Sequence, residues 1–140
     1  MKIEGNWVGQ YTYGEDYPGN YIGKSVLFEM NVTASGIEFY GHFSDDETRN
    51  IFQDEGVVAG FLEGDFISFD KQYPKAWEVN ETGLIEVLED SIPPVIKYEG
   101  VLSDDHFEGT WEIHQYYKEG DEFFSIVNGT GSWSMRKSTS

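Results

Sequence analysis

The chain has 140 residues, no cysteine and a formal net charge of −17, from 26 acidic and 9 basic side chains. This length is typical of one domain with a sizeable core, so we expect residues 1–140 to form a single domain. A surface this negative repels phosphate backbones and anionic membranes, which argues against binding to nucleic acid or to a membrane. The charge itself serves either solubility or a basic protein partner, and the sequence leaves both open.

The chain also lacks the segments that would direct it out of the cell or into a membrane. No stretch approaches the roughly 20 apolar residues of a membrane span, and Met1–Glu4 lacks the apolar run of a secretion signal. Without cysteine, neither disulfides nor thiolate chemistry can contribute. We therefore expect a cytoplasmic protein.

Apolar and polar residues alternate along most of the chain, which is the pattern of half-buried antiparallel strands. Gly, Asn, Asp and Ser are frequent in the connections, and Asn128-Gly129 is the strongest hairpin signal among them. We predict nine strands: 6–13, 26–33, 37–43, 56–62, 65–72, 95–102, 107–117, 122–127 and 130–136.

Two segments allow more than one structure. Ser44 and Glu47 match the capping box of a helix N-terminus, so the segment that follows is either a short helix ending near Gly56 or a polar loop. Between residues 74 and 92, the runs 77–80 and 84–88 either add two strands or form a flap.

Short antiparallel strands in this number form either a two-sheet sandwich or a closed barrel, and a barrel leaves no exposed edges. Gly-x-Trp occurs at 5–7, 109–111 and 131–133. At a barrel end, Gly lets a strand coil sharply while Trp plugs the opening. We therefore predict an all-β antiparallel meander, closed into a barrel of 8–10 strands with at most one short helix.

A Gly-x-Trp on the first strand, meandering hairpins and a basic residue late in the last strand resemble the calycin superfamily: lipocalins, fatty-acid-binding proteins and avidin-like barrels. The resemblance is architectural and spans nearly the whole chain. It implies that Trp7 packs against a cation from the last strand, Arg136 or its neighbour Lys137, a contact of roughly 0.5–2 kcal/mol. It also implies a small, largely apolar or aromatic ligand. The chain departs from secreted lipocalins in lacking a secretion signal and disulfides.

Inward positions of the predicted strands indicate where such a ligand would bind. Aromatic rings with few polar groups are the usual make-up of a small-molecule pocket. The predicted ligand-binding residues are Tyr11, Tyr13, Met30, Phe39, Lys71, Tyr73, Tyr98, Trp111 and Gln115. The alternative is a barrel packed shut by side chains, which would be an acidic protein-interaction module without a ligand.

Lys71 is the charged member of this set. It shares the apolar face of Ile67 and Phe69, so its ammonium either reaches the rim or pairs with an acidic group inside the barrel. We expect it at the inner rim, paired with an anionic or carbonyl group of the ligand. A β-bulge would instead turn it to solvent.

The sequence contains no recognised catalytic or metal-binding pattern. His42, His106 and His114 lack the spacing of a zinc or haem site. The acidic clusters at 45–47, 54–55, 104–105 and 119–122 lack the EF-hand spacing, so we expect solvated loops there. We predict no metal and no cofactor, find no support for an enzyme, and leave the oligomeric state open.

Overall fold

The computed structural model describes residues 2–15, 17, 21–79, 82 and 84–138. These residues contain no α-helix, and their strand content confirms the all-β prediction. Ten strands are present: β1 (Gly5–Tyr13), β2 (Ser25–Ser35), β3 (Glu38–Asp45), β4 (Gly56–Glu63), β5 (Phe66–Gln72), β6 (Ala76–Val79), β7 (Ile85–Leu88), β8 (Val95–Ser103), β9 (His106–Glu119) and β10 (Glu122–Lys137).

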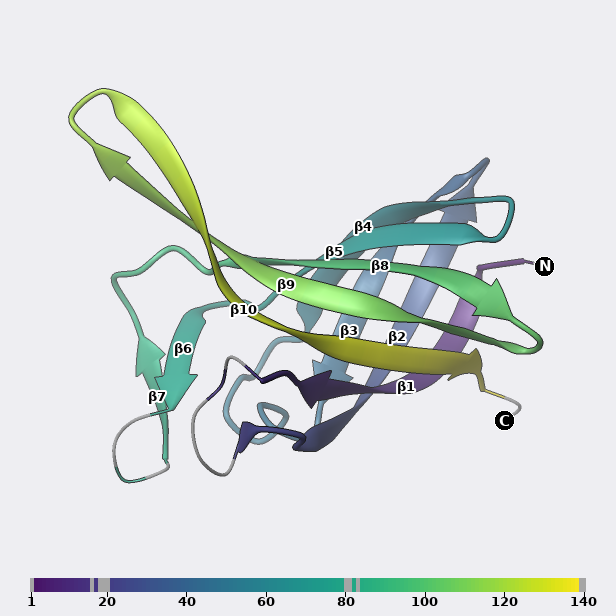
Figure 1. The fold of residues 1–140 in the computed structure, drawn as a ribbon, viewed down its shortest axis with the longest axis horizontal. Coiled ribbons are helices and arrows are strands. Elements are labelled where there is room, and N and C mark those ends of the chain that lie inside the picture. The colour runs from purple at the N-terminus through teal and green to yellow at the C-terminus, as the bar shows by residue number, and fades with distance from the viewer. Residues whose placement is uncertain (1, 16, 18–20, 80–81, 83, 139–140) are drawn as a thin grey trace.

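Eight strands form a closed antiparallel barrel in the order β1-β10-β9-β8-β5-β4-β3-β2, so the predicted barrel is confirmed. β6 and β7 pair only with each other and form a hairpin outside the barrel. The segment between residues 74 and 92 therefore adds two strands, although Asn80 of the predicted run lies outside the described residues. In Figure 1 the two termini lie at one end of the barrel and the β6–β7 hairpin at the other.

We call the end away from the termini the mouth. β1 ends there at Tyr13, β3 at Asp45 and β5 at Gln72. Residues 46–51 form turns after β3, so the polar loop, and not the helix, is the structure of this segment. Arg49 N donates to the Asp45 carbonyl at 2.9 Å and Phe52 N to the Thr48 carbonyl at 3.2 Å, which are two helix-like turns that do not join into a helix.

The hairpin predicted at Asn128-Gly129 is wrong. β10 runs unbroken from Glu122 to Lys137 and pairs with β9, with a register shift between Val127 and Gly129. A shift of this kind bends a strand and increases its local twist. A Cβ at Gly129 would overlap the Tyr17 phenol, so glycine serves here for close packing and not for a turn.

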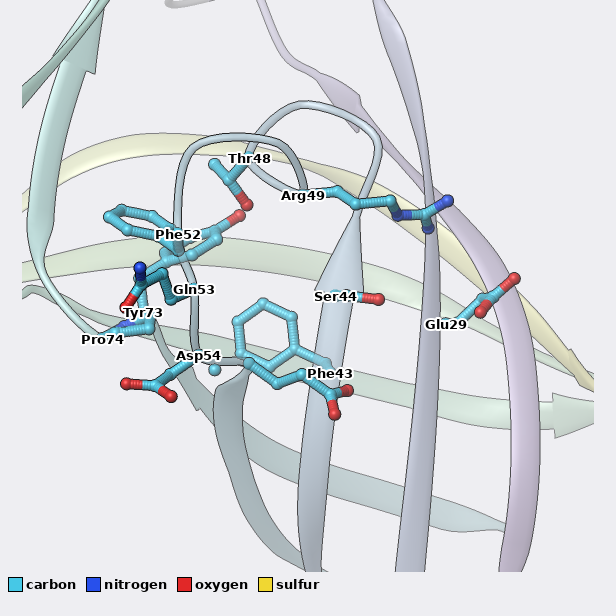
Figure 2. A pocket seen from close by; sticks show the side chains of 12 residues that line it. Glu29, Phe43, Ser44, Thr48, Arg49, Phe52, Gln53, Asp54, Tyr73 and Pro74 are labelled. Atoms are coloured by element: carbon cyan, nitrogen blue, oxygen red, sulfur yellow. The ribbon is translucent and has the colours of Figure 1, made fainter.

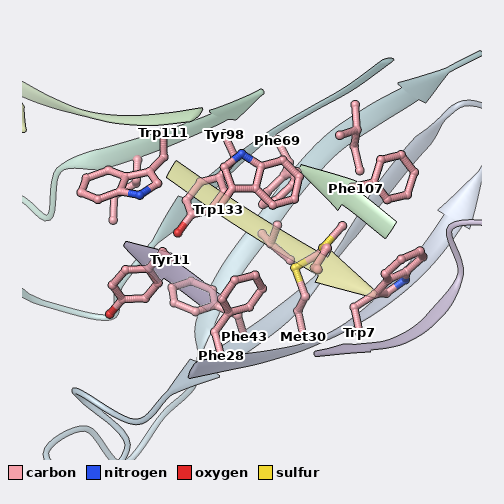
Figure 3. Close-up of a cluster of buried hydrophobic side chains, with 14 of the residues drawn as sticks. Trp7, Tyr11, Phe28, Met30, Phe43, Phe69, Tyr98, Phe107, Trp111 and Trp133 are labelled. Atoms are coloured by element: carbon pink, nitrogen blue, oxygen red, sulfur yellow. The ribbon is translucent and has the colours of Figure 1, made fainter. Parts of the chain in front are cut away.

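Aromatic side chains from most strands fill the barrel interior (Figure 3). Phe69 and Tyr98 stack with ring centroids 4.9 Å apart, and the Trp133 ring lies 5.3 and 5.4 Å from the two. Tilted and stacked rings at these distances interact favourably beyond the area they bury. An eight-stranded barrel is narrow enough for such side chains to pack its interior.

Two of the Gly-x-Trp motifs interlock across β9 and β10. Gly109 is paired in register with Trp133, and Gly131 with Trp111. A Cβ at Gly131 would overlap the Trp111 indole. Both indole N–H groups donate to backbone carbonyls at 2.9–3.1 Å. Gly131 makes room for the Trp111 indole, whereas the room for Trp133 comes from Gly100 of β8 and not from Gly109.

Trp7 closes the barrel end near the termini. Its side chain is fully buried, and its ring lies 5.5 Å from that of Phe107. The indole N–H donates to the Ile3 carbonyl at 2.7 Å, which holds the N-terminal segment over this end.

The expected contact between Trp7 and Arg136 is wrong. Arg136 pairs with Val8 on the outer face of the barrel, and both side chains are exposed. The register instead places Lys137 opposite Trp7, but Lys137 is exposed too and donates to the Lys2 carbonyl at 3.1 Å. Alternation along β10 gives Lys137 the parity of the buried Trp133 and Met135 and puts Arg136 on the opposite face.

We expect Gly131→Ala to destabilise the protein by about 1–3 kcal/mol, because the added methyl group would overlap both the Thr12 carbonyl of β1 and the Trp111 indole. Urea unfolding followed by tryptophan fluorescence measures the change. Ser132→Ala at the exposed neighbouring position is the control and should change stability by less than about 0.5 kcal/mol. Equal effects of the two substitutions would contradict the interlocked packing.

Candidate functional site

A lysine side chain lies inside the barrel near the mouth. Lys71 is only 1% exposed, and its register partners Val58 and Ile96 are themselves buried. Burial alternates regularly along β5, so no bulge turns Lys71 to solvent. The ammonium is thus deeper than the inner rim at which we expected it.

Aromatic rings surround the Lys71 ammonium. Nζ lies 3.4 Å from the ring centroid of Phe28, 4.3 Å from Tyr98, 5.0 Å from Phe43 and 5.6 Å from Tyr11. Nζ also donates to the Tyr98 hydroxyl at 3.2 Å. Ring faces attract a cation electrostatically, most strongly where water is excluded, so this cage partly replaces the lost hydration.

Two opposing effects set the protonation of Lys71. Burial lowers its pKa from 10.5 to about 7, while the negative charge of Asp45 acts to raise it. A buried ammonium that loses its hydration favours the neutral amine. Near neutral pH the side chain therefore exists in both protonation states.

Asp45 is a fully buried carboxylate at the end of β3. Its Oδ1 accepts the backbone N–H and the hydroxyl of Thr48, both at 2.8 Å, and its Oδ2 accepts the Tyr73 hydroxyl at 2.5 Å. Buried carboxylates are tolerated when hydrogen bonds replace their water. These bonds attach the loop after β3 to the residue that follows β5.

Glu47 is a second buried carboxylate in the same region, and it too accepts hydrogen bonds from tyrosines. Its side chain is 4% exposed, and its Oε1 accepts the hydroxyls of Tyr11 at 2.9 Å and Tyr13 at 2.5 Å. Lys24 lies 3.5 Å from Oε2. The loop that begins at residue 46 is therefore held against the end of β1 as well as against β5.

Burial raises the pKa values of the tyrosines in this network well above their usual value. For Tyr11 and Tyr98, desolvation is the largest cause, with a contribution from the Asp45 charge, and Tyr13 is raised by desolvation and Glu47. Tyr73 is raised by desolvation and by Asp45. Tyr11, Tyr13 and Tyr73 consequently remain hydrogen-bond donors to the two carboxylates in neutral and mildly basic solution.

Eight of the nine predicted ligand-binding residues are buried in the barrel: Tyr11, Tyr13, Met30, Phe39, Lys71, Tyr73, Tyr98 and Trp111. They are spread over both ends. Met30 pairs in register with Trp7, far from the mouth, and Phe39 packs on Phe69. Gln115 is half-buried and lies one residue beyond the last pair of β8 and β9, so it does not join the interior group.

The two buried carboxylates were missed because the acidic cluster 45–47 was expected to be a solvated loop. Only Asp46, with a side chain 51% exposed, fits that expectation. For Asp45 a signal was available, because it continues the alternation of the buried residues Phe39 and Phe43 along β3. For Glu47, which lies in the turn after the strand, no periodicity applies.

A pocket of about 400 Å³ opens at the mouth, beside this network (Figure 2). The rings of Phe43, Phe52 and Tyr73 contribute to its wall, together with Thr48 from the loop. Phe43 and Tyr73 are buried core residues whose rings lie 5.1 Å apart. The aromatic core of the barrel thus borders this pocket.

A long hairpin projects from the barrel at the same end (Figure 1). β8 stops pairing with β9 at His114, and β1 stops pairing with β10 at Gly131, so the ribbon between them has no further neighbour strand in the sheet. We call residues 114–127 the arm. Large apolar side chains are exposed on both of its faces: Phe123 (78%), Phe124 (37%), Ile126 (50%) and Val127 (52%).

Two features are absent from the part of the chain that the structure describes. There, no group of three His, Cys, Asp or Glu side chains could hold a metal ion, and no helix is long and apolar enough to cross a membrane. His106 and His114 contact the neighbouring carboxylates Glu108 and Glu112 at 3.1 and 2.8 Å.

The lowered pKa of Lys71 predicts that stability rises with pH. Between about pH 7 and 10 the unfolded chain binds the lysine proton and the folded chain does not, so the free energy of unfolding should increase by about 2–3 kcal/mol up to pH 9.5. Above pH 10 the free energy of unfolding should fall again, because the buried tyrosines ionise only in the unfolded chain. Lys71→Met should remove the rise, as measured by urea unfolding across this range. The exposed Lys97→Met is the control, and an equal slope in both variants would contradict the assignment.

We expect Tyr73→Phe to destabilise the protein by about 1–3 kcal/mol, because it removes a hydrogen bond from the buried Asp45 carboxylate. Chemical denaturation measures the loss. Tyr40→Phe, at a side chain that is 59% exposed, should have no measurable effect. Unchanged stability of Tyr73→Phe would show that the Tyr73 hydroxyl does not support Asp45.

Comparisons of this chain with protein-family models, with curated proteins and with solved structures found no match.

Proposed function

We propose that this protein is an acidic protein-binding module, and that its arm docks onto a basic partner. The observation that carries the proposal is the exposure of Phe123, Ile126 and Val127 on a ribbon that projects from an otherwise closed barrel. Exposed apolar patches of this kind are typical of interaction sites.

The arm has a physical reason to bind. A two-stranded hairpin by itself is marginally stable in water, because it has too little apolar surface to bury. A groove on a partner would cover both faces of the ribbon and remove its apolar side chains from water. Phe123, which is 78% exposed, is the best candidate for the central anchor, since aromatic residues dominate binding hot spots.

Charge selects the kind of partner. The turn of the arm carries the exposed carboxylates Glu119, Asp121 and Glu122, and the whole chain has a net charge of −17. Two copies of such a chain repel each other, whereas a basic surface is attracted and steered toward the arm. We therefore favour a basic protein over a second copy.

Membership of the calycin superfamily, with an apolar or aromatic ligand inside the barrel, stays a prediction, as does the cytoplasmic location. An interior ligand next to Lys71 would have to displace rings whose centroids lie within 5.6 Å of Nζ. The packed interior thus supports the interaction module over the interior ligand.

The test uses a variant that removes the apolar surface of the arm, Phe123→Thr/Ile126→Thr/Val127→Thr. A matched control removes three equally exposed apolar side chains from the barrel wall: Leu27→Thr, Val57→Thr and Val101→Thr. Each immobilised protein is exposed to extract of the cells that make it. Any protein held by the wild type and the control, but not by the arm variant, is then purified and titrated by calorimetry.

We expect the purified partner to be basic, to bind the arm variant at least tenfold more weakly than the control, and to bind more weakly as salt is added. Retention of the same proteins by the wild type and the arm variant would contradict the proposal. A dimer of the wild type in sedimentation, lost only in the arm variant, would show that the arm docks onto a second copy instead.

A further inference from the structure

We propose that the pocket at the mouth binds a small organic cation, an amine or quaternary ammonium group attached to an apolar body. This inference rests on the pocket wall and its charges and not on the arm, so the two proposals stand or fail separately.

The wall offers ring surfaces suited to a cation. Tyr73 lies between Phe43 and Phe52, with ring centroids 5.1 and 6.1 Å away, and all three rings border the same pocket (Figure 2). Ammonium groups are recognised by clusters of aromatic rings in this manner. The Tyr73 hydroxyl donates to Asp45, which makes its ring more electron-rich.

Charge at the rim has the complementary sign. Glu29, Asp54 and Glu55 border the pocket and are exposed. Within the described residues, none of these three carboxylates has an ion-pair partner. Arg49 also borders the pocket, but its guanidinium lies 3.1 Å from Asp46, which offsets its charge.

The buried charged groups near the wall are one lysine, Lys71, and two carboxylates, Asp45 and Glu47. Lys71 lies on the far side of Phe43, with Nζ 5.0 Å from the ring centroid, and would repel a second cation. Asp45, which accepts the Tyr73 hydroxyl, supplies the opposite charge at the same end of the barrel. The exposed rim carboxylates add to the negative charge of the two buried ones, so an anion is disfavoured.

The size of the pocket limits the ligand. A volume of about 400 Å³ lies at the lower end of the range of small-molecule pockets. It suits a molecule with a single ring or a short aliphatic body and one ammonium group. Phe52, the partly exposed ring of the wall, would contact the ammonium group, while the rim carboxylates face the same charge from the other side.

Calorimetric titration with three one-ring probes of similar size tests whether the pocket requires a charged ligand and which sign of charge it prefers. Phenethylamine is the cation, 2-phenylacetamide the neutral analogue and phenylacetate the anion. We expect the cation to bind at least tenfold more tightly than the neutral probe and the anion not to bind measurably. Equal affinity for all three probes, or no binding of phenethylamine at millimolar concentration, would overturn the proposal.

Two variants locate the site. Asp54→Asn/Glu55→Gln removes two rim charges and should weaken phenethylamine binding about three- to tenfold. Phe52→Ala removes one ring of the wall and should weaken it by a similar factor. All three positions, Phe52, Asp54 and Glu55, are at least partly exposed, so the barrel should remain folded, which circular dichroism checks.

The matched control is Asp121→Asn/Glu122→Gln, which removes the same two charges from the turn of the arm. It should leave phenethylamine binding unchanged within about twofold. An equal loss in this control and in Asp54→Asn/Glu55→Gln would mean that the net charge of the whole chain, and not the pocket, attracts the cation. If Phe52→Ala leaves phenethylamine binding unchanged, the aromatic wall does not contribute to binding and the proposed site is wrong.

Discussion

The mouth of the barrel depends on the burial of one carboxylate, that of Asp45. An inward position at the end of β3 removes it from water, and burial is tolerated only because Thr48 and Tyr73 supply three hydrogen bonds. These bonds bend the chain after β3 back over the barrel end. The burial of Lys71 depends on the same carboxylate, because the charge of Asp45, together with aromatic rings, compensates its buried ammonium. Without this carboxylate, the loop would lack its anchor and the lysine its opposite charge.

The two ends of the barrel serve different purposes. At the end near the termini, Trp7 and the N-terminal segment close the interior, and packing alone explains the residues found there. At the mouth, the β3–β4 loop, the β6–β7 hairpin and the arm extend beyond the sheet (Figure 1). Loops and extensions on a rigid scaffold are where binding residues are usually found. Both proposed sites, the pocket and the arm, lie at this end, and each uses exposed carboxylates with apolar neighbours.

Alternation along strands accounts for most of what could be predicted about the interior. Because successive side chains point to opposite faces, Lys71 and Tyr73 were assigned inward from Ile67 and Phe69 alone. The same rule would have assigned Asp45 inward from Phe39 and Phe43. Acidic residues are seldom buried, however, so the acidic cluster 45–47 was predicted to be a solvated loop. The rule does not reach Glu47, whose position in a turn depends on tyrosines from another strand.

The sequence by itself determined the strands, their inward faces and the closed barrel, because these follow from local alternation and from the need to leave no sheet edge exposed. Only the tertiary structure decided the register between strands and the partners of buried groups, because both depend on residues distant in the chain. Asn128-Gly129 has the composition of a tight turn, yet pairing with β9 continues β10 through it, with a register shift between Val127 and Gly129. Arg136 and Lys137 are adjacent in sequence, and the register with β1 decides that Lys137, and not Arg136, lies opposite Trp7. The aromatic cage of Lys71 likewise combines β1, β2, β3 and β8, and no local pattern along β5 could specify it.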